Sequence, residues 1–173
     1  MKNLIIIVAL AFSFFSCQQQ AKIGFVDNGK VINAYQEKKD VEGKYKQKDE
    51  TFQKRRDSMI SAYRLEYQEA QLKASKLRNQ AQLQELSSEI QQKENLLTQK
   101  IQFEQQQMQQ AFNAEIDSVL SKVRTFVDDY GKRNGYTYIL GKNEAGSVMY
   151  GKEEQDISQA IIDELNANYK KKE

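Results

Sequence analysis

The chain contains no proline, no histidine and no tryptophan, and it has a single cysteine among its 173 residues. Without histidine it lacks the commonest general base and metal ligand. No candidate nucleophile lies beside a base, and no glycine-rich loop suits a phosphate group. A lone cysteine cannot form an internal disulfide. We therefore predict that the protein is not an enzyme and that it uses no cofactor and no metal.

Proline is the strongest helix breaker, and the segment from Lys44 to Tyr130 lacks glycine as well. These 87 residues are rich in Gln, Lys, Glu, Arg and Leu, which favour helix. As one helix they would extend about 130 Å, and as a hairpin each arm would extend about 65 Å. The sequence predicts a helical rod that projects into solvent. Such a rod suits a protein that holds, spaces or encloses something.

Charge is nearly balanced, with 26 basic and 24 acidic residues, which argues against a nucleic-acid-binding protein. The two halves of the rod nevertheless differ in sign, with a net charge of +5 over residues 44–82 and −4 over residues 83–130. Opposite charges favour an antiparallel hairpin, although each exposed pair contributes only roughly 0.2–1 kcal/mol. We expect the turn within residues 73–82, where Ser75 and Asn79 are weak helix formers.

Apolar residues in the second half of the rod recur every 11 residues, in two series displaced by four. Eleven residues span three turns, about 3.67 residues per turn, so the apolar seam runs nearly straight. A looser series of the same spacing occupies the first half, with Arg56 interrupting it. We interpret these residues as the contact between the two arms. They are Leu86, Leu97, Met108 and Val119; Ile90, Ile101, Phe112 and Val123; and Val41, Phe52 and Tyr63, with Tyr45, Met59, Tyr67 and Leu72 nearby.

Two groups of residues on the rod are candidates for binding other molecules. The first comprises apolar residues off the main stripes, which would contact a client protein or pack on a neighbouring subunit: Phe103, Met59 and Ile60. The second is a basic cluster at the expected turn, the basic arm tip, formed by Lys73, Lys76 and Arg78. It would meet anionic membrane or acidic client segments, or it is simply a solvated hairpin end.

The first residues read as an export signal. Met1 and Lys2 precede an apolar run, residues 4–15, that is too short to span a bilayer and has the length of a signal-peptide core. We predict a signal peptide over residues 1–16. Cys17 follows the small Ser16, as at the site where a bacterial lipoprotein is cleaved and acylated, so residues 17–21 would form a lipidated N-terminus and linker. The alternative is an ordinary signal peptide that is cut nearby, with Cys17 incidental.

The ends of the chain predict a small body of two parts, residues 22–43 and 131–173, around the rod of 44–130. We expect strands at 22–27, 136–140 and 147–150, a turn at Asn28–Gly29 before a helix that begins within 30–36, and a closing amphipathic helix from Asp156 with Ile157, Ile161, Ile162 and Leu165 on its apolar face. A sheet of three such short strands is not stable on its own in water. The body therefore predicts an oligomer in which several chains share one core.

These features together resemble the Skp (OmpH-like) periplasmic chaperones. The resemblance rests on Lys22-Ile23-Gly24-Phe25-Val26-Asp27, the long Gln-rich hairpin, Asn134-Gly135-Tyr136-Thr137-Tyr138-Ile139-Leu140, and Asp156-Ile157-Ser158. It implies a mainly α fold with a small β body, and a jellyfish-like homotrimer whose helical hairpins surround a cavity. It also implies that unfolded outer-membrane proteins are held in that cavity without ATP. Here the chain is nearly neutral, so electrostatic capture would matter less.

The leading hypothesis is therefore an ATP-independent periplasmic holdase, tethered to a membrane through lipid on Cys17. Many weak contacts, instead of a few strong anchors, would let it release its clients. The alternative is a lipid-anchored coiled-coil spacer or adaptor of the cell envelope that binds no client. The two differ in whether the arms meet non-native chains.

Overall fold

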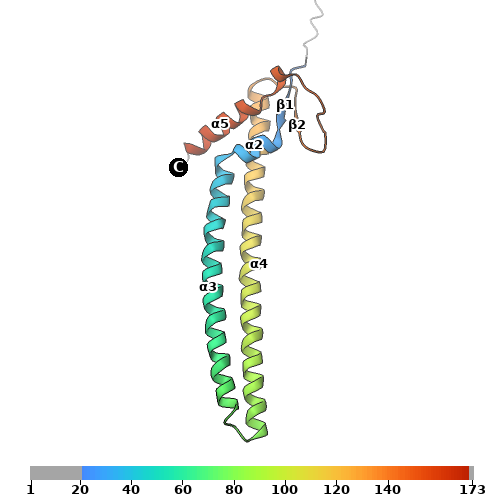
Figure 1. Ribbon diagram of the computed structural model, residues 1–173. Helices are drawn as coiled ribbons and strands as arrows, with labels where there is room; N and C mark the ends of the chain where they lie inside the picture. The colour runs from blue at the N-terminus through green and yellow to red at the C-terminus, as the bar shows by residue number, and fades with distance from the viewer. Residues whose placement is uncertain (1–20, 172–173) are drawn as a thin grey trace, which may run out of the picture.

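The computed structural model describes residues 21–171, and it is mainly helical with one small sheet. Two long helices form a rod that projects from a body at one end (Figure 1). The body contains β1 (Ile23–Asp27), α2 (Asn28–Ala34), β2 (Tyr138–Lys142), η2 (Glu153–Gln155) and α5 (Ser158–Lys170). The predicted signal peptide and Cys17 lie outside the described residues.

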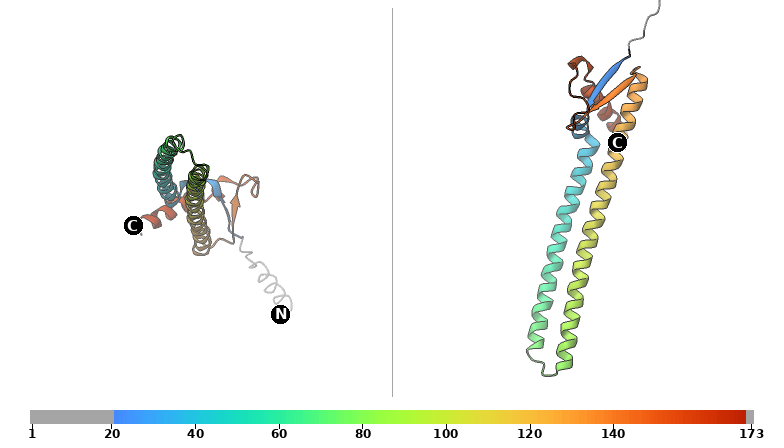
Figure 2. Two further views of the ribbon diagram at one scale, coloured as in Figure 1. Left: turned by 90° about the horizontal axis from the view of Figure 1, so that it is seen from below. Right: turned by 90° about the vertical axis from the view of Figure 1, so that its right-hand side faces the viewer.

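The rod is an antiparallel hairpin of α3 (Gln36–Ala74) and α4 (Gln80–Arg133), which lie side by side in every view (Figures 1 and 2). Its turn, residues 75–79, falls within the predicted segment. Ser75 Oγ donates to the Leu72 carbonyl at 2.8 Å, and Asn79 Oδ1 accepts from the Ala81 backbone N–H at 2.9 Å. The two weak helix formers thus end one helix and cap the next.

Both helices extend past the glycine-free segment. α3 begins eight residues before Lys44 and contains Gly43, where an added Cβ would meet nothing within 4 Å. α4 continues through Gly131 to Arg133. Glycine lowers helix stability by roughly 0.5–1 kcal/mol relative to alanine. Packing along so long a hairpin outweighs that cost, so the glycines do not mark the helix ends.

Within residues 21–171 the sheet has two strands instead of the three expected. β1 and β2 run parallel, with Ile23 opposite Tyr138 and Asp27 opposite Lys142. The prediction of a strand at 147–150 was wrong, because that segment forms bends in which Met149 and Tyr150 are 88% and 84% exposed. The other edge of β1 is occupied by a bridge between Phe25 and Asp156 and by a bond from Ile157 N–H to the Phe25 carbonyl.

β2 also begins two residues later than predicted. Gly135 adopts a φ of +68°, and the Tyr136 N–H donates back to the Gly131 carbonyl at 2.9 Å. The chain therefore leaves α4 through a turn and reaches the register of β1 only at Tyr138. A left-handed φ of this kind favours glycine, which explains why the Asn134–Gly135 pair stands at this position.

The prediction of a turn at Asn28–Gly29 was also wrong. These residues are the first two of α2, because the Asp27 side chain accepts from the Lys30 N–H at 2.9 Å and caps the helix directly after the strand. The expected single helix is divided into α2 and α3 at Tyr35, whose ψ of 123° is extended.

The closing helix forms as predicted, with Asp156 Oδ1 accepting from the Ser158 N–H at 2.9 Å at its start. Its predicted apolar face is buried. That face completes a core between β1, α2, α4 and α5, which contains Val26, Val31, Tyr35, Val119, Val123, Tyr130, Ile157, Ile161, Ile162 and Leu165.

Candidate binding surface of the helical hairpin

The seam between the arms follows the 11-residue series of α4. Val119 and Val123 are buried, and the other six members of the two series are partly buried. From α3, Tyr45 and Phe52 are buried, and the Tyr45 and Phe112 rings meet edge to face with centroids 5.2 Å apart. The predicted interhelical contact is confirmed for Tyr45 and Phe112. Val119 and Val123, at the base of the hairpin, belong to the core of the body.

The α3 side of the seam is less regular, as expected, and two of its predicted members are exposed. Tyr67 is 44% exposed, and its ring lies beside that of Tyr63 on its own helix, with ring centroids 6.3 Å apart. Leu72 lies seven residues after Leu65, which is also exposed, so both lie on the face of α3 turned away from α4. Tyr67 and Leu72 therefore do not belong to the seam that the sequence predicted.

Three of the ion pairs across the hairpin form a ladder with the same 11-residue spacing. Lys44 pairs with Glu115, Arg55 with Glu104, and Glu66 with Lys93. The members on α3 are 11 residues apart, and so are their partners on α4. The apolar and the charged repeats therefore specify one register. The sequence contained this signal, but the charges could be paired only once the position of the turn was known.

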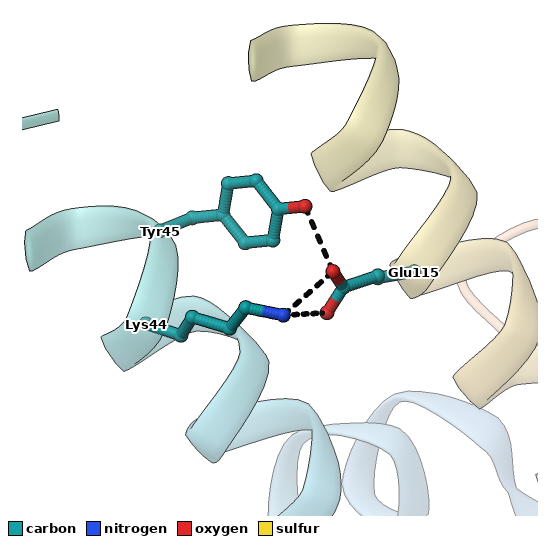
Figure 3. A network of polar contacts seen from close by, with 3 residues as sticks. All are labelled: Lys44, Tyr45 and Glu115. Atoms are coloured by element: carbon teal, nitrogen blue, oxygen red, sulfur yellow. Dashed lines mark hydrogen bonds and ion pairs between the residues drawn. The ribbon is translucent and has the colours of Figure 1, made fainter. Parts of the chain in front are cut away.

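Figure 3 shows the first of these pairs. Lys44 Nζ donates to both oxygens of Glu115, at 2.7 and 2.8 Å, and the Tyr45 hydroxyl donates to Oε1 at 2.9 Å. Hydrogen bonds from Lys44 and then Tyr45 lower the pKa of Glu115, and the bond to Glu115 raises the pKa of Lys44. Both groups stay charged over a wide range of pH.

The polarity of the ladder reverses along the rod. In the first two pairs the cation belongs to α3, whereas in the third the acid, Glu66, belongs to α3 and the cation, Lys93, to α4. Sliding one helix by a single repeat would place Arg55 opposite Lys93 in one direction, or Glu66 opposite Glu104 in the other. The apolar seam tolerates such a shift, because it repeats every 11 residues. The charges therefore disfavour the registers that the seam alone would allow.

Large apolar side chains remain exposed on the outer faces of the hairpin. Phe103 is 61% exposed, and Leu96, seven residues earlier on the same face of α4, is 65% exposed. The Arg55–Glu104 pair brings Met59, four residues after Arg55, to the same part of the rod. Met59 and Ile60 are only partly exposed. Sequence reasoning missed Leu96 and Leu65, which a count of apolar residues outside the 11-residue series would have found.

The basic arm tip lies where it was expected. Lys73 lies in the last turn of α3, Lys76 and Arg78 lie in the turn between the helices, and all three are exposed. The nearby Leu72 is exposed as well, whereas Leu77 is partly covered. The distal end of the rod is therefore a positively charged surface with one apolar side chain beside it.

Residues 21–171 include no group of three or more His, Cys, Asp or Glu side chains arranged to hold a metal ion. Within the same range no helix has the length and apolarity needed to cross a bilayer. The candidate site that we consider is the outer surface of the rod, where apolar side chains such as Leu96 and Phe103 are exposed near paired charges such as Arg55 and Glu104.

A long antiparallel helical hairpin inserted between the two parallel strands of a small body defines the architectural class of the protein. A family described as outer membrane protein (OmpH-like) matches residues 22–165. The chain belongs to this OmpH-like family.

A crystal structure from Caulobacter crescentus CB15, provisionally assigned as an outer membrane chaperone (OmpH-like), is similar to this chain with a TM-score of 0.74. The two are 16% identical in sequence, and the match covers 86% of each chain. At this identity the similarity concerns the fold alone. No curated protein sequence matches this chain significantly.

Proposed function

We propose that the protein is an ATP-independent periplasmic holdase that binds unfolded outer-membrane proteins between the helical arms of a homotrimer. The observation that carries this proposal is the exposure of Leu96 and Phe103 on a rod whose neighbouring charges, such as Arg55 and Glu104, already pair with each other. Such a surface offers apolar contact without fixed polar partners. It suits many weak and interchangeable contacts with a non-native chain.

The trimer is supported by the exposed sheet of the body. Within the described residues the sheet has two strands, and β2 pairs only with β1. Its side chains Tyr138 and Leu140 are exposed, as are Met149 and Tyr150 in the following loop. An isolated two-stranded sheet is marginal in water. If these surfaces of several chains pair with one another, they become buried, and the arms are arranged around a common axis.

Membrane attachment is part of the same proposal. Acylation of Cys17 would place the body at a membrane surface, with the linker of residues 17–21 between lipid and fold. The basic arm tip would then lie at the far end of the rod from the body, where positive charge attracts acidic client segments.

The test is light scattering of a denatured outer-membrane β-barrel protein that is diluted into buffer with or without the soluble form lacking residues 1–17. A holdase suppresses aggregation at about one trimer per client, because each client is enclosed once. The alternative is a lipid-anchored spacer or adaptor of the envelope, for which the length of the hairpin is the supporting observation. A folded trimer that leaves aggregation unchanged would exclude the holdase and favour the spacer.

A further inference from the structure

The two helices of the hairpin join the body in different ways. α4 is unbroken over its 54 residues, and its last part contributes Val119, Val123 and Tyr130 to the core. α3 is separated from α2 by the single extended residue Tyr35, with φ −68° and ψ 123°. Core packing and continuous helical hydrogen bonds therefore fix α4 to the body. Movement of α3 relative to the body has its natural pivot at Tyr35.

One side chain of α5 bridges this pivot. The amide oxygen of Asn166 accepts from the Gln36 backbone N–H at 2.8 Å, and its nitrogen donates to the Ala34 carbonyl at 3.2 Å. Gln36 is the first residue of α3 and Ala34 the last of α2, and groups at helix ends lack partners within their own helix. An amide side chain suits this position because it carries both an acceptor and donors.

The pivot residue itself is tied to two other helices. The Tyr35 ring meets Tyr169 of α5 edge to face, with centroids 6.0 Å apart, and its hydroxyl donates to Glu37 Oε2 at 2.5 Å. Glu37 in turn pairs with Lys122 of α4. Asn166 and Tyr169 both lie beyond the range that matches the OmpH-like family, which ends at residue 165. The joint is therefore held by a part of α5 outside that match.

We propose that Asn166 is a positioning residue that clamps the joint between α2 and α3, and so fixes the direction in which α3 leaves the body. Without its amide, α3 pivots about Tyr35 and the hairpin loosens at its base. The clamp concerns the fold and holds whether or not the protein binds clients. If the proposed chaperone function is correct, the clamp also sets the space between the arms.

The test measures distances by electron spin resonance between labels on cysteines introduced at two exposed positions, Ser61 of α3 and Ala160 of α5, in a full chain carrying Cys17→Ser. Cys17 is the sole native cysteine, so only the introduced sites react. Labelled chains are diluted with unlabelled ones so that distances within one chain dominate. In Asn166→Ala we expect a distribution about twice as wide, and exchange of the Gln36 amide about tenfold faster, as loss of one hydrogen bond implies.

The matched control is Asn168→Ala, two residues further along α5 and exposed, which should leave both measurements unchanged. Asn166→Asp keeps the acceptor for Gln36 and loses the donor to Ala34, so it should keep slow exchange at Gln36 with a smaller broadening. A folded Asn166→Ala variant with a narrow distribution and slow exchange at Gln36 would overturn the clamp. If Asn166→Ala does not fold, the Asn166→Asp variant becomes the test. A distance distribution as narrow as that of the unsubstituted chain would then overturn the clamp.

Discussion

Arg55 of α3 pairs with Glu104 of α4 one 11-residue repeat beyond the pair of Lys44 with Glu115, so charge and apolar packing share one period along the hairpin. An 11-residue period needs almost no supercoil. The arms can therefore run side by side for their whole length, with equivalent positions of the repeat facing each other. Side chains spaced by 11 residues on the outer surface then point in nearly the same direction along the whole rod.

The ladder predicts a charge-reversal cycle. Arg55→Glu places two acids opposite each other and should lower the free energy of unfolding by about 0.2–1 kcal/mol, the range of exposed pairs. Adding Glu104→Arg restores attraction and should recover most of the loss. Thermal unfolding followed by circular dichroism measures both variants. Equal stability of the single and double variants would show that the pair does not contribute to the register.

The same ladder predicts how stability depends on pH. The pKa of Glu115 is lowered in the folded chain, so its contribution is present above its ordinary value of 4.5 and is lost as the pH falls through the lowered pKa. The pKa of Lys44 is raised, so its contribution is present below its ordinary value of 10.5 and is lost as the pH rises through the raised pKa. Burial and the bond to Glu115 also raise the pKa of Tyr45, so its contribution is present below its ordinary value of 10.0 and is lost as the pH rises through the raised pKa. The stability difference between the native chain and Glu115→Gln should therefore be constant between pH 4.5 and pH 10.0 and shrink outside this window. A difference that varies within that window would contradict the assignment.

Two phenylalanines of the hairpin offer a matched pair that separates packing from binding. Phe52 is 4% exposed in the seam, whereas Phe103 is 61% exposed on the outer surface. Phe52→Ala should lower the free energy of unfolding by about 3–5 kcal/mol through the cavity it leaves. Phe103→Ala should change stability by less than about 0.5 kcal/mol, and it should weaken suppression of client aggregation. Unchanged suppression in the Phe103 variant would remove this residue from the proposed binding surface.

Glycine substitutions test the backbone of the two parts of the molecule. Gly43 is helical with open space around its Cα, so Gly43→Ala should stabilise the chain by roughly 0.5–1 kcal/mol. Gly135 has a φ of +68°, so Gly135→Ala should destabilise it by about 1–2 kcal/mol, and Gly135→Asn by less. Chemical denaturation measures all three, and a loss of stability in Gly43→Ala would contradict the helical assignment there.

The sequence predicted the hairpin well because its signals are long and repeated. Eleven-residue spacing over four repeats, the absence of proline, and opposite charge in the two halves all indicate the same arrangement. The body was harder to predict because its signals are short. Ser147–Tyr150 contains Val148 and Tyr150, which favour strands, but the other edge of β1 is taken by Asp156. The break at Tyr35 has no local signal, since a distant side chain, Asn166, supplies the hydrogen bonds that stabilise it.

The candidate surface was predicted in part for the same reason. Phe103 was found because it lies off a regular series, whereas Met59 and Ile60 lie at the borders of a less regular one and are only partly exposed. Leu96 was missed because it stands next to Leu97, which belongs to the seam. Adjacent residues on a helix face directions about 100° apart, and only the register of the partner arm shows which of the two is covered.

The trimer can be tested at the sheet. Tyr138 is exposed on β2 in the single chain, and the proposal buries it between subunits. Tyr138→Asp should therefore convert the oligomer to monomers, because an unpaired charge would be placed in an apolar interface. Light scattering coupled to size-exclusion chromatography measures the mass. Tyr67→Asp is the same substitution at an exposed position of the arm, and it should leave the mass unchanged. If the Tyr138 variant stays trimeric, the subunits associate through another surface. If the unsubstituted protein is itself a monomer, the enclosed cavity has no basis and the spacer function is favoured.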